Sequence, residues 1–287
     1  MLAEFGPEGV RRLVIHSPSL QLHPRCARTR GRSPLRRLMP DTPDFGTLDV
    51  SNFTVGAMLR AGIAVRRIVR GTESLEEAAD VVVRYLYDQC IEPGSGERSC
   101  ALVRFYKTHM YGGLAPDLQL VAARQLEERQ PDDAMRCLVL LGTAGDEVDW
   151  NSRSASQAHR AIPLPSADIV RQAPMIASLI EDLGLDIEAI VSGSATPMRG
   201  PDARTYDVFH VEDALGSPHI PAQREFVVPY GIKSVVGFGG LLRSGELFAV
   251  ILFTRVTIPK ASAARFRTIA LDVRSALYAL DEAKTWK

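Results

Sequence analysis

The sequence of 287 residues lacks a long apolar run. No stretch approaches the roughly 18 to 20 apolar residues that cross a bilayer, and the most apolar one, Leu247 to Phe253, has the length of a strand. A secretory signal is also lacking, because the apolar patch Leu13 to Ile15 is too short for its core. Apolar residues still make up 46% and charged residues 24% of the chain, which is ordinary for a globular protein. We therefore expect a soluble protein with no membrane partner.

Cysteine is scarce, and the four thiols form no CxxC pair. Neither a zinc knuckle nor a disulfide framework is indicated, so we expect a reducing, cytoplasmic setting. Three of them, Cys90, Cys100 and Cys137, lie among apolar neighbours, and we expect these thiols to be buried.

Catalytic and metal-binding motifs are missing too. There is no HExxH, GxSxG, GxGxxG or GK[ST], and the histidines are widely spaced. The glycine-rich run Gly237 to Gly240 is followed by a second β-rich segment, whereas phosphate binding needs a helix N-terminus there. We expect no metal, no catalytic residues and no enzymatic activity; a catalytic constellation assembled only by the fold is an open alternative.

Charge is balanced overall, with 34 basic and 34 acidic residues, but unevenly placed. Residues 1 to 40 hold eight arginines and two glutamates, which leaves 26 basic against 32 acidic residues in the remainder. A net charge of about minus six has the wrong sign for a phosphate-binding surface, so no nucleic-acid partner is expected. We interpret residues 1–45 as a disordered basic extension and note Met39 as a candidate start of normal sequence; a basic arm for nucleic acid or anionic lipid is the alternative.

Helical periodicity marks both ends of the remaining chain. Apolar residues recur at three- and four-residue steps in Ser51 to Arg70, which predicts an amphipathic helix within an N-terminal helical segment, 46–72. Ser74 to Glu77 has the form of a capping box and predicts a second helix to about Cys90. The segment Ser262 to Trp286 contains no Gly or Pro and predicts a terminal helix of some six turns.

Between these helices, β-rich runs alternate with turns. Strands are predicted at Cys100 to Tyr106 and Met135 to Leu141, and further ones at Ile187 to Val191 and Phe226 to Val228. The clearest pair, Lys233 to Leu242 and Leu247 to Val256, is joined by a short Gly-containing turn and predicts an antiparallel hairpin. Two more helices are expected, at Asp117 to Glu128 and Ser166 to Leu183.

This order of elements resembles the GAF domain, and the PAS domain shares the architecture. The likeness is strongest in Tyr230 to Val236 and in Leu247 to Phe253, followed by a helix rich in Ala and Leu. The resemblance covers roughly Ser74 to Leu280 and is closest to sensory regions of bacterial two-component (histidine kinase) signalling proteins. It implies an α+β fold, an antiparallel five- to six-stranded sheet flanked by helices, with residues 73–287 as the sensory domain.

A polar stretch between the second strand and the next helix is the first candidate for a binding wall. In this family small ligands sit below a loop at that place, and here the loop offers an aromatic platform, a planar cation and hydrogen-bonding groups. Tyr230 of the turn and Phe238 of the glycine-rich strand complete the set. The predicted ligand-binding residues are Trp150, Asn151, Arg153, His159, Tyr230 and Phe238. An ordered loop that only packs on the core is the alternative.

The segment Ser217 to Gln223 is similar to a stretch that bilin-binding GAF domains of phytochromes place beside the chromophore. His219 stands where that family has aspartate, and no cysteine follows Val211, so a thioether at the downstream site is excluded. A tetrapyrrole-binding photosensor is therefore only a secondary alternative.

The resemblance implies a non-catalytic regulatory module that binds a small molecule or senses a signal in bacterial signal transduction. The cofactor and ligand are unknown from sequence, and a separately encoded effector such as a histidine kinase is the expected partner. The alternative is a dimerisation or protein-interaction module with an unused pocket. Because the two end helices are expected on one side of the sheet, we also predict a homodimer that buries part of Met58, Ile63, Val273 and Leu277.

Overall fold

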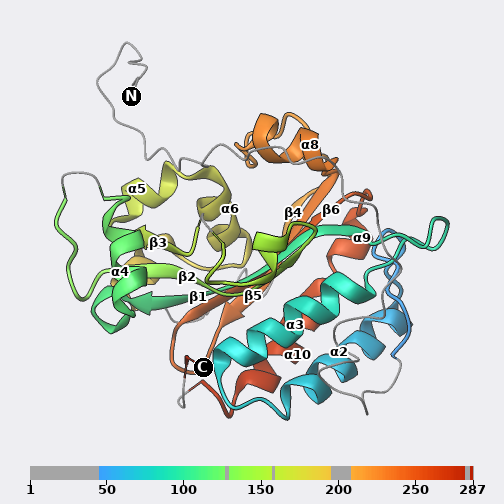
Figure 1. Cartoon of the computed structure of the whole chain (residues 1–287), viewed down its shortest axis with the longest axis horizontal. Helices are drawn as coiled ribbons and strands as arrows, with labels where there is room; N and C mark the ends of the chain where they lie inside the picture. Colours follow the sequence, from blue (N-terminus) through green and yellow to red (C-terminus); the bar gives the residue numbers. More distant parts are fainter. Residues whose placement is uncertain (1–44, 127–128, 157–158, 195–207, 282–284, 287) are drawn as a thin grey trace.

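A single antiparallel sheet organises the chain, and it is seen in a computed structural model that describes residues 45–126, 129–156, 159–194, 208–281 and 285–286. Its six strands are β1 (Cys100–Met110), β2 (Arg136–Gly145), β3 (Ala161–Leu164), β4 (Val208–Val211), β5 (Ser234–Leu241) and β6 (Leu247–Thr254). They lie in the order β3-β2-β1-β6-β5-β4, with every neighbouring pair antiparallel (Figure 1). The α+β fold class predicted from the sequence, an antiparallel sheet flanked by helices, is confirmed.

The predicted hairpin lies near the centre of this sheet. β5 and β6 pair from Ser234 and Thr254 to Leu241 and Leu247, and β6 also pairs with β1. Every residue of both strands is buried, because helices or loops cover each face of the sheet. A strand buried on both faces has an apolar run in place of alternation, which is the pattern in this part of the sequence.

One side of the sheet, which we call the helical face, is covered by long helices. They are α2 (Val55–Val69), α3 (Leu75–Gln89) and α10 (Phe266–Leu277), preceded by the short α9 (Lys260–Ala263) (Figure 1). The predicted capping box is present in modified form. Ser74 Oγ accepts a hydrogen bond from Glu77 N, while Glu77 Oε2 reaches back to Glu73 N, one residue before the cap.

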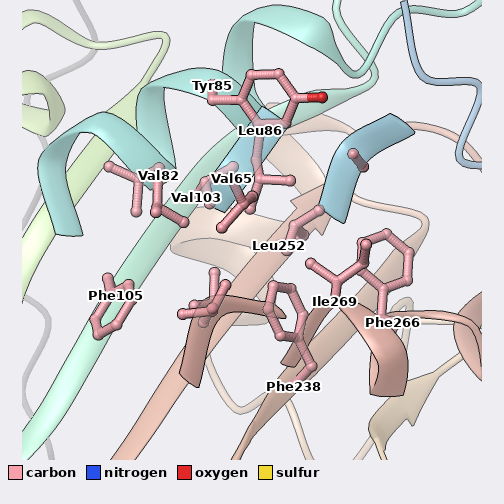
Figure 2. Close-up of a cluster of buried hydrophobic side chains, with 14 of the residues drawn as sticks. Val65, Val82, Tyr85, Leu86, Val103, Phe105, Phe238, Leu252, Phe266 and Ile269 are labelled. Atoms are coloured by element: carbon pink, nitrogen blue, oxygen red, sulfur yellow. The ribbon is translucent and has the colours of Figure 1, made fainter. Parts of the chain in front are cut away.

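The core of the helical face is built from aromatic and branched side chains that meet between these helices and the sheet (Figure 2). Phe266 of α10 is central to it, because its ring stacks on Phe53 at 4.8 Å and on Phe238 of β5 at 5.5 Å between centroids. All three rings are at most 1% exposed. Each buried aromatic contributes roughly 1.5 to 3 kcal/mol to folding, so this layer carries much of the stability.

Gly142 lets α3 approach the sheet closely. A Cβ at this position would lie 2.7 Å from the backbone carbon and oxygen of Ala79 in α3. The neighbouring β1–β2 register shifts between Phe105 and Tyr106, at the point where Gly142 pairs. The bulge and the missing side chain together fix how α3 rests on the sheet.

The other side, which we call the loop face, is covered by short helices and turns. They are α5 (Ala167–Arg171), α6 (Pro174–Asp182), α7 (Ile187–Ser192), the π-helical turn η3 (Gln223–Val227) and α8 (Val228–Tyr230). Leu179 of α6 and Val227 of η3, together with Ile220 just before η3, belong to the apolar cluster on this face. Three more elements lie at the ends of β1 and β2: η1 (Tyr111–Gly113), α4 (Pro116–Ala123) and η2 (Val148–Asn151).

Two predicted strands are wrong. Ile187 to Val191 lies in α7, where the Asp186 carboxylate accepts from Ala189 N and caps the helix. Phe226 to Val228 spans η3 and α8, and the Gln223 side chain organises this turn through bonds to Ala214 O, Ile220 O and Gly216 N. In short apolar runs such local capping bonds decide between helix and strand.

Predicted helices are shorter in the structure. The one expected at Asp117 to Glu128 is α4, which ends at Ala123. Pro174 divides Ser166 to Leu183 into α5 and α6, since proline disfavours helical geometry in the residue before it. The unbroken helix to Trp286 is wrong as well: α10 starts at Phe266 and ends at Leu277. Beyond it Asp281 accepts bonds from Ser244 N and Oγ, which anchors the chain at the β5–β6 turn.

The predicted dimer surface needs correction too. α2 and α10 do lie side by side on the same face, as expected (Figure 1). However, Val273 and Leu277 are 0% and 1% exposed within one chain, so neither can be buried against a partner. Of the four residues predicted for the dimer surface, Met58 is half-buried and Ile63, at 52%, is the one with substantial exposed apolar surface.

The predicted N-terminal extension, residues 1–45, lies outside the described residues except for Phe45. In the part of the chain that the structure describes, no helix has both the length and the apolar character to cross a membrane.

Candidate functional site

The loop face carries an aromatic group built from two of the predicted binding residues. Trp150 of η2 and Tyr230 of α8 have ring centroids 4.7 Å apart, although 80 residues separate them in the sequence. Phe226 joins both, at 5.7 Å from Trp150 and 5.6 Å from Tyr230, and meets Phe253 of β6 edge-on at 5.0 Å. The structure thus assembles an aromatic platform on the loop face.

Tyr230 is the polar member of this platform. Burial raises the pKa of its hydroxyl to about 12, and the nearby Glu147 carboxylate, which also accepts its hydrogen bond, adds to the shift. The hydroxyl therefore stays protonated at neutral pH and acts as a donor.

Asn151 and Arg153, also predicted to bind ligand, support the loop itself. Asn151 Nδ2 donates to Gly145 O and Glu147 O at 2.7 Å each. Arg153 Nε donates to Glu76 of α3 at 2.9 Å, so this cation is paired across the edge of the sheet. Both side chains hold the loop against β2 and α3.

The Arg153 guanidinium also lies over the ring of Trp286, 5.1 Å from its centroid. His109, near the end of β1, meets the same ring at 5.2 Å, and Glu76 N donates to Thr285 O. Thr285 and Trp286 are therefore held against β1, α3 and the loop.

Phe238 is separated from the other predicted residues. It lies in the core of the helical face, 0% exposed and stacked on Phe266 (Figure 2). The structure does not bring it to the platform, which is on the opposite side of the sheet.

His159 has an unusual backbone and an unsatisfied side chain. Its φ of 61° is the only positive value among the described residues other than glycine, and its buried Nδ1 has no hydrogen-bond partner. Burial, followed by the charge of Arg104, lowers the pKa of His159 to about 3. The imidazole is therefore neutral at physiological pH.

Arg104 was missed by the sequence reasoning. It follows Leu102 and precedes Tyr106 on the same side of β1, since side chains alternate along a strand, and both neighbours belong to the loop-face cluster. Its Nη1 donates to Tyr106 Oη at 3.1 Å, and its buried Nε has no partner. The available signal was a charged residue in the middle of the β-rich run Cys100 to Tyr106.

Unpartnered buried atoms are few and partly clustered. In the described ranges they are Tyr85 Oη, Ser99 Oγ, Arg104 Nε, His109 Nε2, His159 Nδ1 and Arg160 Nε. Arg104 and His159 interact electrostatically, and Arg160 follows His159 in the chain. No group of three or more His, Cys, Asp or Glu side chains suited to a metal occurs among the described residues.

Comparison with known proteins gives structural neighbours only. No family model matches the sequence, and no curated protein matches it. The chain is similar to the GAF domain of an Acinetobacter phosphoenolpyruvate-protein phosphotransferase (10% identity, TM-score 0.38) and to that of the Coxiella burnetii protein of the same name (13%, 0.40); each match covers 77% of this chain and 93% of the other. It is also similar to the phycoerythrobilin-bound GAF domain of a cyanobacterial phytochrome, at 14% identity and TM-score 0.38, over 77% of this chain and 94% of that one.

Proposed function

We propose that this chain is a non-catalytic regulatory module that binds a small molecule on the loop face of its sheet. Its setting is signal transduction in the bacterial cytoplasm, and its output passes to a separately encoded effector such as a histidine kinase. The sequence resemblance to GAF sensory regions supports this setting.

One observation carries the proposal. Arg104 Nε and His159 Nδ1 are buried without partners on the loop face, and a buried polar atom without a hydrogen bond costs about 1 to 3 kcal/mol. A bound molecule that makes these hydrogen bonds offsets the cost, and the half-buried rings of Tyr230 and Phe226 beside the buried Trp150 offer it aromatic contact. The elements that cover this face are only three to nine residues long, whereas α2, α3 and α10 have 12 to 15 residues.

A thermal-shift screen of the full chain tests the proposal. The compounds are cyclic nucleotides, haem, amino acids, organic acids and aromatic metabolites, because a ligand that binds only the folded state must raise the melting temperature. A hit should lose its effect in Trp150→Ala and keep it in Val228→Ala, whose side chain is 60% exposed. Absence of any hit across the screen would contradict ligand binding.

A second candidate function, dimerisation, is favoured by the outer surface of α2. Val55, Leu59 and Ile63 follow one another at four-residue steps and are 55%, 56% and 52% exposed. This row, which we call the α2 stripe, is apolar surface that the chain does not cover with its own described residues. Sedimentation of the full chain at tens of micromolar tests it: a dimer together with an empty ligand screen would favour this function over the first.

A further inference from the structure

Arg104 places a positive charge on the loop face of the sheet. The residue lies on β1, which pairs with β2 on one side and β6 on the other, and it faces Thr143 and Ile251 across those strands. Ile251, like Leu102 and Tyr106, belongs to the buried apolar cluster. The guanidinium therefore extends from the middle of the sheet into apolar surroundings.

The charge of Arg104 is not compensated within the described part of the chain. Three other shielded arginines each pair with a carboxylate: Arg136 with Glu246, Arg153 with Glu76 and Arg160 with Asp117. Arg104 makes no ion pair there, and its one hydrogen bond is to the neutral Tyr106 hydroxyl. A shielded cation without a counter-ion is costly, and arginine is always charged.

We propose that the ligand of the loop face carries an oxyanion, a carboxylate or phosphate group, that pairs with the Arg104 guanidinium. This rests on the proposed function, because it names the ligand class of the same face. The planar guanidinium presents parallel N–H donors that match two oxygens of such a group. The Nε that lacks a partner belongs to one of these donor edges.

Tyr106 and His159 then act as positioning residues. The Tyr106 hydroxyl holds Nη1, which fixes the plane of the guanidinium and leaves the Nε side for the ligand. The neutral His159 ring brings an uncharged donor or acceptor beside the cation without adding a second positive charge. With the proton of the neutral ring on Nδ1, one oxyanion accepts hydrogen bonds from both His159 Nδ1 and Arg104 Nε, the two buried atoms without partners.

Side-chain NMR of the full chain tests the proposal directly. The Nε–H signal of Arg104, assigned by its loss in Arg104→Lys, is followed while sodium succinate or sodium phosphate is added, with sodium chloride at matched ionic strength as the reference. At least one of the two probes should shift this signal, and comparison of the two distinguishes a carboxylate site from a phosphate site. A shift equal to that in chloride, or no shift with either probe, overturns the proposal.

Affinity measurements with matched variants provide the second readout. In Arg104→Gln the affinity for the active probe should fall at least tenfold, the order expected for losing charge-assisted hydrogen bonds. Arg67→Gln removes the same charge from an exposed position of α2 and should stay within about twofold. The ligand-free melting temperature of Arg104→Gln should be equal to or above that of the parent, because an uncompensated charge is removed.

The outcomes separate this inference from the proposed function. A neutral ligand found in the screen and bound equally well by Arg104→Gln would refute the oxyanion and leave the regulatory module intact. Unchanged probe binding in Arg104→Gln would refute the oxyanion as well. If Arg104→Gln fails to fold, Arg104→Lys and the wild-type NMR titration still decide the question.

Discussion

Replacing Leu277 by glutamate should strongly destabilise the protein, whereas the same replacement of Leu59 should barely change its stability. Comparing the two variants tests the packing on the helical face. Leu277, at the end of α10, is 1% exposed, whereas Leu59 in the middle of α2 is 56% exposed. The two substitutions place the same glutamate side chain on α10 and on α2, which are neighbouring helices of the helical face. Helix propensity barely changes, because leucine and glutamate are both good helix formers.

The magnitudes follow from burial. Removing the buried Leu277 side chain costs about 2 to 5 kcal/mol, and an unpaired carboxylate in its place adds several kcal/mol unless it takes up a proton. Since typical domains are stable by about 5 to 15 kcal/mol, Leu277→Glu should melt at least 10 °C lower or fail to fold. Leu59→Glu should change stability by no more than about 0.5 kcal/mol.

Urea unfolding monitored by circular dichroism, together with sedimentation velocity on the same samples, measures both effects. If the α2 stripe forms a dimer, Leu59→Glu should yield folded monomers at concentrations where the parent is dimeric. A Leu277→Glu variant that is folded and as stable as the parent would refute the assignment of this residue to the core of the chain.

Three further predictions concern packing, pH and thiol chemistry. Gly142→Ala should destabilise the protein by about 1 to 3 kcal/mol in urea unfolding, because its methyl group would meet the Ala79 backbone, while Gly94→Ala, with nothing within 4 Å, serves as the control. The free energy of unfolding should fall below pH 6.5, because folding lowers the pKa of His109 and His159 to about 3 and the unfolded chain therefore takes up protons first. From pH 7 to pH 5 this loss of stability is about 2 kcal/mol per histidine. His109→Gln should make the dependence of stability on pH less steep. Cys90, Cys100 and Cys137 are buried, and burial raises the pKa of Cys137 to about 12. Mass spectrometry after brief alkylation should therefore find these three thiols unlabelled in the native protein and labelled in urea. Fast labelling of the native protein would contradict their burial.

The elements that could be predicted from the sequence are those in which a regular apolar pattern extends over many residues. The β5–β6 hairpin and α2 and α3 have eight or more residues of consistent period, together with a turn or a cap at their ends. The short strands β3 and β4 were not predicted. β3 and β4 have four residues each, and β3 contains Pro163, which is tolerated at the edge of a sheet and hides the strand in the sequence.

The candidate site was predicted only in part, because the residues that form it come from distant parts of the sequence. Trp150 and Tyr230 were singled out, and the fold brings their rings together, whereas Phe238 was placed with them although strand alternation turns it to the other face. Arg104 could not be recognised because nothing local tells whether a carboxylate will meet a cation in a strand. That depends on which strands and loops surround it after folding.

The attachment of Trp286 to the loop gives the protein an optical property. The sequence contains two tryptophans, and they bracket the same segment: Trp150 lies within the loop, and Trp286 packs against its Arg153. Their environments differ, since one indole meets Tyr230 and Phe226 and the other lies between a guanidinium and the His109 imidazole. Any displacement of the loop changes the surroundings of both rings, so intrinsic emission of the unlabelled chain reports on that displacement, and replacing either tryptophan by phenylalanine assigns the signal to one side of the loop.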